Sequence, residues 1–194
     1  MSPPKMQPVE RFYLQPTKYS PNSILPVLLY RNVLPSSHSA GSATEFLEGN
    51  GWERRGIFGH YPTPHFHPNT HECYGIFQGS STLRIGSGKN DCHSAGILIP
   101  VAAGDVIVIP AGITHSCVES VDGYQYVGVY PKSAPKWRND FGEDPVDLVV
   151  MRRETSAVEM PETDPVYGTE GPLMSLWTDA VEQDSPAAAA DHPL

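Results

Sequence analysis

Four side chains that can bind a metal ion lie close together in the sequence. His65, His67, His71 and Glu72 all fall in the stretch HFHPNTHE. The prolines and aromatic residues of YPTPHFHP disfavour a helix, so we expect an extended backbone, on which residues two apart project from the same face. His65 and His67 would then point the same way, with Cα atoms about 6 to 7 Å apart, and both imidazoles could reach one ion.

A carboxylate and a further imidazole complete a donor set. The turn at Pro68 to Thr70 places Glu72 at the start of an antiparallel return strand, and His115 opens another strand after the turns of GDVIVIPAGITH. Three imidazoles and one carboxylate suit Fe, Mn, Ni, Co, Cu or Zn, and are too rich in nitrogen for Ca or Mg. We predict one divalent transition metal per chain, with His65, His67, Glu72 and His115 as its ligands.

The elements around these residues have the pattern of an all-β domain. From Trp52 to Tyr130, short apolar runs alternate with Gly, Pro, Asn and Asp at intervals of roughly eight to twelve residues, as in antiparallel sandwiches and barrels. The apolar stretch Ser23 to Val33 predicts a strand, which Pro26 confines to a sheet edge or to a strand start. Ser42 to Glu45 match a capping box and predict a short helix over about 43–50.

The ends of the chain differ in composition from this middle part. Residues 1–22 are rich in proline and predict an extended arm, whose order would come from docking on something else. Residues 23–177 are predicted to form one barrel domain with an acidic, proline-rich C-terminal wrap. Residues 178–194, which end in SPAAAADHPL, are predicted to be a disordered tail.

Composition excludes several classes of protein. A net charge of −9 and only 13 Lys and Arg in 194 residues argue against a nucleic-acid partner, which requires clustered basic residues. The sequence has no apolar run long enough for a membrane span and no apolar core of a signal peptide, so we expect a cytoplasmic protein without a membrane partner. Cys73, Cys92 and Cys117 lack CxxC spacing and are predicted to be free thiols.

Two spaced motifs resemble those of the cupins, which are small antiparallel β-barrels of jelly-roll type. The first cupin motif, G(X)5HXH(X)3,4E(X)6G, is matched by Gly59, His65, His67, Glu72 and Gly79. The second, G(X)5PXG(X)2H(X)3N, is matched by Gly104, Pro110, Gly112 and His115, but Glu119 stands where the pattern has Asn. The closing DPVYGTEGPLMSLW is similar to the ending of a subgroup of single-domain cupins in bacteria and fungi that has no assigned function. The resemblance implies a cupin-type jelly-roll barrel with one short N-terminal helix and extended terminal arms.

Other polar residues are candidates for supporting chemistry. On an uninterrupted strand, Glu119 would return to the inner face and could transfer a proton; the alternative is an ordinary loop carboxylate. Tyr74, like Tyr61 and Tyr126, would line the cavity by strand parity and could donate a hydrogen bond to a substrate, or could simply be a packing residue. His71 should point away from Glu72, to the surface or to a supporting position.

A metal with four protein ligands keeps positions open for a small molecule. A bidentate oxygen ligand could bind there, and the first hypothesis is an oxidoreductase of the dioxygenase type acting on a small oxygenated or aromatic substrate. The second is a metal-dependent isomerase or lyase such as a decarboxylase, and the third is a small-molecule binder without catalysis. The edge strand expected in SILPVLLY also predicts a homodimer.

Overall fold

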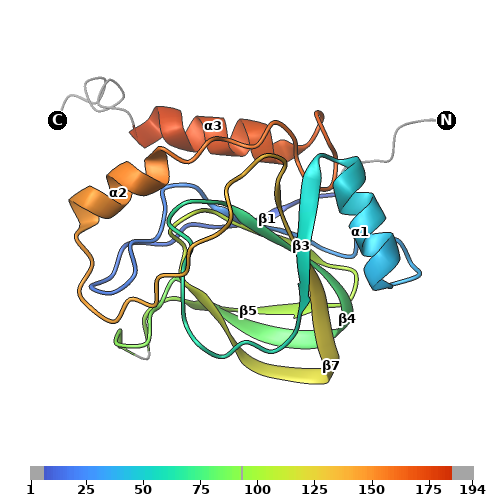
Figure 1. Cartoon of the computed structure of the whole chain (residues 1–194), viewed down its shortest axis with the longest axis horizontal. Helices are drawn as coiled ribbons and strands as arrows, with labels where there is room; N and C mark the ends of the chain where they lie inside the picture. Colours follow the sequence, from blue (N-terminus) through green and yellow to red (C-terminus); the bar gives the residue numbers. More distant parts are fainter. Residues whose placement is uncertain (1–6, 93, 185–194) are drawn as a thin grey trace.

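The computed structural model describes residues 7–92 and 94–184, and these residues form a barrel covered on one side by helices (Figure 1). Seven strands belong to one sheet. The elements are β1 (Glu10–Phe12), β2 (Val27–Tyr30), α1 (Ala40–Gly49), β3 (Trp52–Phe58), β4 (Glu72–Ile85), β5 (Ile97–Ala102), β6 (Val106–Ile109), β7 (His115–Pro131), α2 (Leu148–Ser156) and α3 (Pro172–Asp184).

The sheet is antiparallel throughout and is organised around β4. Six strands follow the order β1-β2-β6-β4-β7-β3, and β5 pairs with β4 beside this path. The first residues of β4 pair with β6, its last residues pair with β5, and β7 runs along its other side. The all-β jelly-roll barrel with a short helix before the main strands is the fold that the sequence predicts.

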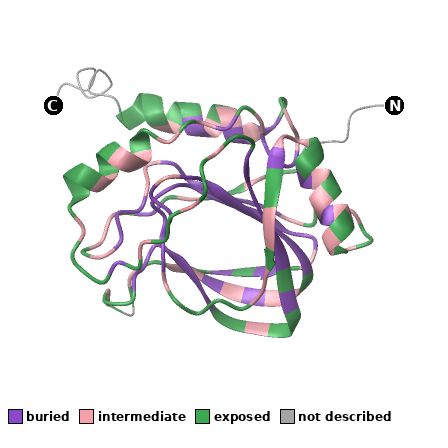
Figure 2. Ribbon diagram, in the orientation of Figure 1, coloured by how far each residue is buried: buried purple, intermediate pink, exposed green. Residues whose placement is uncertain are grey.

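Strand alternation divides the apolar residues between two cores. On β6, Val106 and Val108 belong to the core between the outer sheet face and the helices, whereas Ile107 and Ile109 belong to the core inside the barrel. Trp177 of α3 also belongs to the core between the sheet and the helices, which we call the helix-side core. Buried residues therefore lie along the strands while the helices keep exposed outer faces (Figure 2), and a position on a strand decides which core a side chain enters.

Helix α1 begins three residues earlier than the sequence predicts. Ser39, not Ser42, is the N-cap residue: its hydroxyl accepts from the Ser42 amide at 3.1 Å, and the Ser42 hydroxyl accepts from the Ser39 amide at 3.2 Å. This is a reciprocal capping box, with Ser42 in the third helical position. The prediction of 43–50 placed the N-cap at Ser42, because the pattern that begins there resembles the one that begins at Ser39.

The strand predicted within SILPVLLY is present, but it is not an edge strand. β2 starts directly after Pro26 and pairs with β1 on one side and β6 on the other. Its four residues are all buried. The expectation of an exposed edge here is wrong because part of the N-terminal arm forms β1 and covers it.

A buried carboxylate organises the start of the C-terminal wrap. Asp164 is fully buried, and its Oδ1 accepts hydrogen bonds from the amides of Val166 and Tyr167 at 2.8 and 3.0 Å. Its Oδ2 accepts from the Tyr30 hydroxyl at 2.6 Å and from the Leu173 amide at 3.1 Å. The closing DPVYG motif therefore ties the wrap to β2 and to the start of α3.

The last helix extends into the segment predicted as a disordered tail. α3 runs to Asp184, with Leu173 and Trp177 buried against the sheet, and the Trp177 indole donates to the Pro26 carbonyl at 3.0 Å. Residues 178–184 are thus helical rather than disordered, because they continue a helix whose first turns are anchored in the core. The remainder of the predicted tail, 185–194, lies outside the described residues.

The state of the cysteines and the character of the helices can be compared with the sequence predictions. Cys73, Cys92 and Cys117 are free thiols, as predicted. Within the ranges that the structure describes, no helix combines the length and apolar character needed to cross a membrane.

Candidate metal centre

The segment carrying His65 and His67 is extended and is held on both sides. His65 exchanges two backbone hydrogen bonds with His115, at 3.2 and 2.9 Å, while Phe66 exchanges two with Asp140. The alternation turns Phe66, which is fully buried, away from the two imidazoles. The predicted parity of His65 and His67 is therefore confirmed.

The second motif bonds directly to the first. The Gly112 amide donates to the His67 carbonyl at 2.9 Å, and His115 begins β7 directly beyond this turn. Gly112 has φ +87°, a left-handed conformation that glycine adopts without the strain of a Cβ. The turn thus holds the third imidazole against the first two.

Glu72 reaches the same place from the other side of the barrel interior. It is the first residue of β4, is paired with Ile109 of β6 and is almost fully buried. Its neighbour Cys73 belongs to the helix-side core, so alternation turns the Glu72 side chain inward.

The four predicted ligands converge in the structure. The side-chain nitrogens of His65, His67 and His115 lie within 4.8 Å of one another, and all three residues are buried. Glu72 Oε2 lies 3.1 Å from His67 Nε2 and 3.3 Å from His115 Nε2. Three buried histidines that could hold a metal ion thus share one site with a carboxylate.

Backbone carbonyls determine which ring nitrogen of each histidine faces inward. The Nδ1 atoms of His65, His67 and His115 lie 3.0, 3.2 and 3.0 Å from the carbonyls of Thr63, Arg138 and Ile113. A carbonyl accepts only, so these contacts assign the proton to Nδ1 in each neutral ring. The Nε2 lone pairs are left to face the centre, which is how metal-binding histidines are usually oriented.

The charges of the cluster are strongly coupled. Burial and the neighbouring His115 lower the pKa of His65 to about 3. Burial also disfavours charge on His67 and Glu72, but their mutual attraction outweighs it, so the pKa of His67 is raised and that of Glu72 is held well below its ordinary value. The site therefore favours negative charge on the carboxylate and a positive charge close to it.

A bound cation would satisfy the three imidazoles and the Glu72 carboxylate better than hydrogen bonds within the protein do. Although His115 Nε2 lies 3.3 Å from Glu72, it has no hydrogen-bond partner of acceptable geometry within the described residues. A buried polar atom without a partner costs about 1–3 kcal/mol. A divalent ion would accept all three Nε2 lone pairs and the carboxylate at once, and this N3O set suits a transition metal.

A small cavity adjoins the cluster on the side of His65 and His115. It has a volume of about 10 Å³ and is lined by these two histidines and, among others, Tyr61, Tyr74 and Tyr126. A cavity of this size holds about one water molecule. The prediction that the three tyrosines line the cavity is confirmed.

Tyr74 lies at the inner wall of this cavity. Its ring stacks on Tyr126 with centroids 3.8 Å apart and lies 6.0 Å from the His115 ring. Burial, followed by the charge of Glu72, raises the pKa of Tyr74 well above its ordinary value. The Tyr74 hydroxyl therefore keeps its proton.

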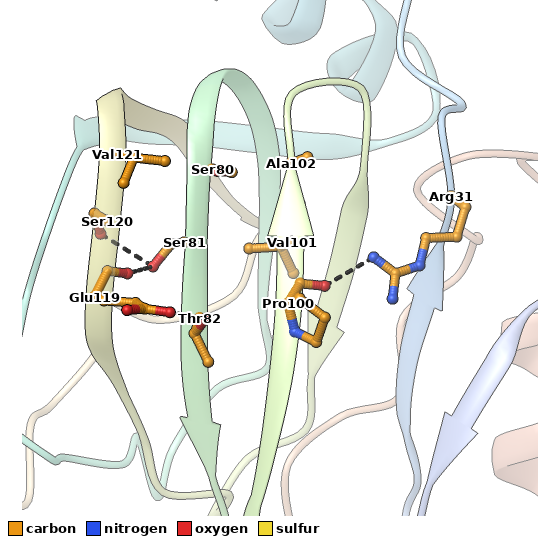
Figure 3. A pocket seen from close by; sticks show the side chains of 10 residues that line it. All are labelled: Arg31, Ser80, Ser81, Thr82, Pro100, Val101, Ala102, Glu119, Ser120 and Val121. Atoms are coloured by element: carbon orange, nitrogen blue, oxygen red, sulfur yellow. Dashed lines mark hydrogen bonds between the residues drawn. The ribbon is translucent and has the colours of Figure 1, made fainter.

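Glu119 does not join the cluster, and its predicted inward orientation is wrong. Cys117 pairs with Leu83 and Glu119 pairs with Thr82, so β7 contains one extra residue, Val118, at this point. This β-bulge reverses the alternation that an uninterrupted strand would have. Glu119 is exposed and accepts a hydrogen bond from the Thr82 hydroxyl at 3.0 Å, in a separate cavity across β7, β4 and β5 (Figure 3).

His71 points away from Glu72, as predicted, but it is buried rather than at the surface. Its Nδ1 accepts the Ala111 amide at 3.0 Å, and its ring lies 4.7 Å from the Trp177 ring. Burial lowers the pKa of His71 to about 3, so the ring is neutral at physiological pH. His71 therefore connects the first motif to the second from behind the cluster.

Tyr130 was not singled out from the sequence, yet it touches a predicted ligand. Its hydroxyl donates to Glu72 Oε1, and burial and Glu72 raise its pKa, which keeps the donor protonated. The signal was present in YQYVGVY, where Tyr124, Tyr126 and Tyr130 share one strand parity. Only the neighbouring strand shows that the third of these reaches Glu72.

Comparison with known proteins agrees with this architecture. The family model described as Cupin matches residues 59–135, which include both motifs and all four converging side chains. The part of the chain that carries both motifs is thus similar to the cupins. A curated relative, the uncharacterized protein YjlB of Bacillus subtilis (strain 168), is 27% identical over 152 residues, which are 78% of this chain and 86% of that protein.

Three solved structures resemble this chain at low sequence identity. RmlC of Streptococcus suis in complex with dTDP-D-xylose has a TM-score of 0.35 at 9% identity, over 85% of this chain and 95% of that chain. The ribosomal oxygenase YcfD of Escherichia coli has a TM-score of 0.32 at 18% identity, over 83% and 47%. The oxalate decarboxylase of Lactobacillus farciminis has a TM-score of 0.31 at 16% identity, and this chain spans only 25% of its length while 60% of this chain is covered. Similarities this low support no functional argument.

Proposed function

We propose that this protein is a metal-dependent oxidoreductase of the dioxygenase type that acts on a small oxygenated molecule. The observation that carries the proposal is a group of three buried histidines whose ligand atoms lie within 4.8 Å of one another, two of them 3.1 and 3.3 Å from Glu72 Oε2. His115 Nε2 also lacks a hydrogen-bond partner among the described residues. A single divalent transition metal per chain, held by His65, His67, Glu72 and His115, would satisfy these groups together.

The bound metal would supply Lewis acidity and, for a redox-active ion, electron transfer, with coordination positions left for substrate. The protein's own part is to hold the four donors in place. The backbone carbonyls at Nδ1 fix the three rings, and all four side chains are buried, which limits contact with water. Such preorganisation reduces the cost of arranging the site during the reaction.

The exposed side chains beside His65 mark the side from which a small substrate would enter. Tyr61 and Phe141, whose rings lie 4.9 and 6.3 Å from the His65 ring, are 40% and 38% exposed and mark the solvent side. The inner wall is closed by Tyr74 and Tyr126. A compact bidentate ligand such as an α-hydroxy acid or an enediol fits this access better than an extended one, with the Tyr74 hydroxyl as a donor to one of its oxygens.

The alternative, an isomerase or lyase, needs a base that removes a proton from the substrate. Glu119, the carboxylate considered for this role, lies in another cavity. Among the described residues that line the small cavity, Tyr74 and Tyr126 have raised pKa values and so keep their protons, and no carboxylate or imidazole lies outside the cluster. The lack of a base among these lining residues favours the dioxygenase over the isomerase or lyase.

Metal content is the first test of the proposal. His67→Ala and His115→Ala should lower bound metal well below one ion per chain in elemental analysis of protein purified without added metal or chelator. The matched control is His60→Ala, because His60 is exposed and contacts Ser120 rather than the cluster. Wild-type metal content in both cluster variants would refute the site.

Oxygen consumption separates the candidate reactions. With an α-hydroxy acid, enediol or catechol, metal-loaded protein should consume O2 in proportion to product, and His115→Ala should not. Turnover under strict anaerobiosis would indicate the isomerase or lyase instead. Saturable binding without turnover in either atmosphere would indicate a small-molecule binding protein.

The cysteines and the sheet edge bear on the compartment and on the oligomeric state of the protein. Free thiols at Cys73, Cys92 and Cys117 support a reducing compartment such as the cytoplasm. A homodimer remains a prediction, although β2 is not the edge that would form it; β1 is the outer strand on that side. The mass in solution at micromolar concentration tests the dimer.

A further inference from the structure

The two oxygens of Glu72 have different surroundings. Oε2 faces His67 and His115, at 3.1 and 3.3 Å from their Nε2 atoms. Oε1 accepts a hydrogen bond from the hydroxyl of Tyr130, which lies on β7, the strand paired with the start of β4. One oxygen is thus held by a neutral donor while the other faces the lone pairs of the cluster.

The ring of Tyr130 is itself held in place from two directions. Trp137 stacks on it with centroids 5.2 Å apart and an angle of 8° between the planes, and the Arg55 guanidinium lies 5.2 Å from its centroid. Arg55 is anchored in turn on the carbonyls of Pro135 and Ala134. A tyrosine that is 1% exposed and packed in this way has little freedom to move its hydroxyl.

We propose that Tyr130 is a positioning residue, which fixes the Glu72 carboxylate so that Oε2 is presented to a metal ion bound by the three histidines. The inference rests on the metal site proposed above and adds to it a residue outside the cupin motifs. Trp137 and Arg55 act one step further away, by holding the Tyr130 ring.

A purely structural role for this contact has a reference within the same protein. Tyr30 also donates its hydroxyl to a buried carboxylate, that of Asp164. Asp164 accepts three backbone amides besides, so its orientation does not depend on Tyr30. Glu72 has no such amide donors among the described residues, and Tyr130 is the only donor to it from outside the histidine cluster.

The position of a ligand carboxylate matters because metal binding depends on geometry to within a few tenths of an ångström. Groups that orient metal ligands typically contribute 10- to 100-fold to metal affinity. Without the hydroxyl, the Glu72 side chain can rotate, and Oε1 is left buried without a donor.

The experiment compares Tyr130→Phe with Tyr30→Phe, since each removes one hydroxyl from a buried carboxylate. Full-length protein is titrated with Co(II) in competition with a chelator, and the visible absorption of bound Co(II) is recorded. Tyr130→Phe should bind Co(II) about 10- to 100-fold more weakly, with shifted absorption bands. Tyr30→Phe should keep the wild-type affinity and spectrum, even if it unfolds more easily.

The outcomes are distinct. If wild-type protein binds no Co(II), the metal site itself fails. If wild-type protein binds and Tyr130→Phe retains the same affinity and spectrum, the metal site stands and the role of Tyr130 is refuted. If Tyr130→Phe does not fold, Trp137→Leu replaces it: this variant keeps the hydroxyl but removes the stacked ring, so it should weaken Co(II) binding, and unchanged affinity would overturn the inference.

Discussion

Two buried carboxylates in this protein, Asp164 and Glu72, have opposite surroundings. Asp164 at the start of the C-terminal wrap accepts one hydroxyl and three backbone amides, all of which are hydrogen-bond donors. Glu72 inside the barrel accepts one hydroxyl and otherwise faces imidazole nitrogens whose partner nitrogens contact backbone carbonyls. Both carboxylates are buried, but Asp164 is met by four hydrogen-bond donors, whereas Glu72 Oε2 depends on a proton at His67 or on a bound cation.

This difference indicates a structural role for Asp164 and a role in the candidate metal site for Glu72. Buried charge is tolerated when the protein supplies enough donors, as around Asp164. Around Glu72 the missing positive charge must come from a proton on His67 or from a bound cation. The surroundings of a carboxylate thus distinguish its role better than its burial does.

The largest effect should follow from Asp164→Asn. The amide group would place N–H donors against the Tyr30 hydroxyl or against backbone amides, so about two hydrogen bonds to a charged group would be lost. We expect the free energy of unfolding to fall by about 3 to 6 kcal/mol, measured by urea denaturation. Added metal should still raise the melting temperature of this variant; loss of that response would contradict the separation of the two carboxylates.

Glu72→Gln should weaken metal binding, which Asp164→Asn should leave intact. If the metal dissociation constant rises about 100-fold, metal at 1,000 times the wild-type constant stabilises the variant by about 2.7 kcal/mol less than it stabilises wild type. Melting temperatures with and without Co(II) measure this difference. An equal increase in melting temperature for both proteins would show that Glu72 is not a ligand.

His71 lies between helix α3 and the candidate metal site. Its ring contacts Trp177 of α3, and its Nδ1 accepts the Ala111 amide of the second motif. Its pKa is lowered by burial from 6.5 to about 3, so the unfolded chain takes up the proton first. The stability that neutral His71 contributes is fully present above pH 6.5 and is lost toward pH 3, by about 1.4 kcal/mol per pH unit. His71→Gln should flatten this pH dependence in metal-free protein.

Unfolding by urea at pH 7, 6 and 5 measures the effect of His71→Gln, because glutamine can still accept the Ala111 amide but does not titrate. The control is the exposed His60, whose replacement by Gln should leave the slope unchanged. Identical pH slopes for wild type and His71→Gln would count against a buried neutral His71.

Glu119→Ala should have the smallest effect. Its carboxylate is exposed and contacts only the Thr82 hydroxyl among the described residues, so stability should change by less than about 0.5 kcal/mol. Co(II) affinity should equal that of wild type. A weaker Co(II) complex would mean that Glu119 reaches the cluster in a conformation other than the one described.

The four side chains of the candidate metal site could be predicted from sequence because each depends on local rules. His65 and His67 follow from strand parity, and Glu72 and His115 follow from turns flanked by glycine and proline at fixed spacing. Each of these signals lies within a few residues. The barrel itself is similarly encoded in repeated short apolar runs between turns.

Other features could not be predicted because they depend on distant partners. The extra residue at Val118 reverses the direction of Glu119, and only the pairing of β7 with β4 shows it. β1 covers β2, although its own three residues carry no strand signal. Tyr130 and Asp164 have important roles only through residues 58 and 134 positions away.

The hydrogen bond between Trp177 and Pro26 spans 151 residues and has a consequence during synthesis. At about 5 to 20 residues per second, translation needs roughly 8 to 30 s to travel from one partner to the other. For that interval, the apolar surface of the nascent chain that α3 finally covers is open to solvent. We therefore expect ribosome-bound chains that stop before Leu173 to recruit chaperones, and chains that include Trp177 outside the ribosome to release them.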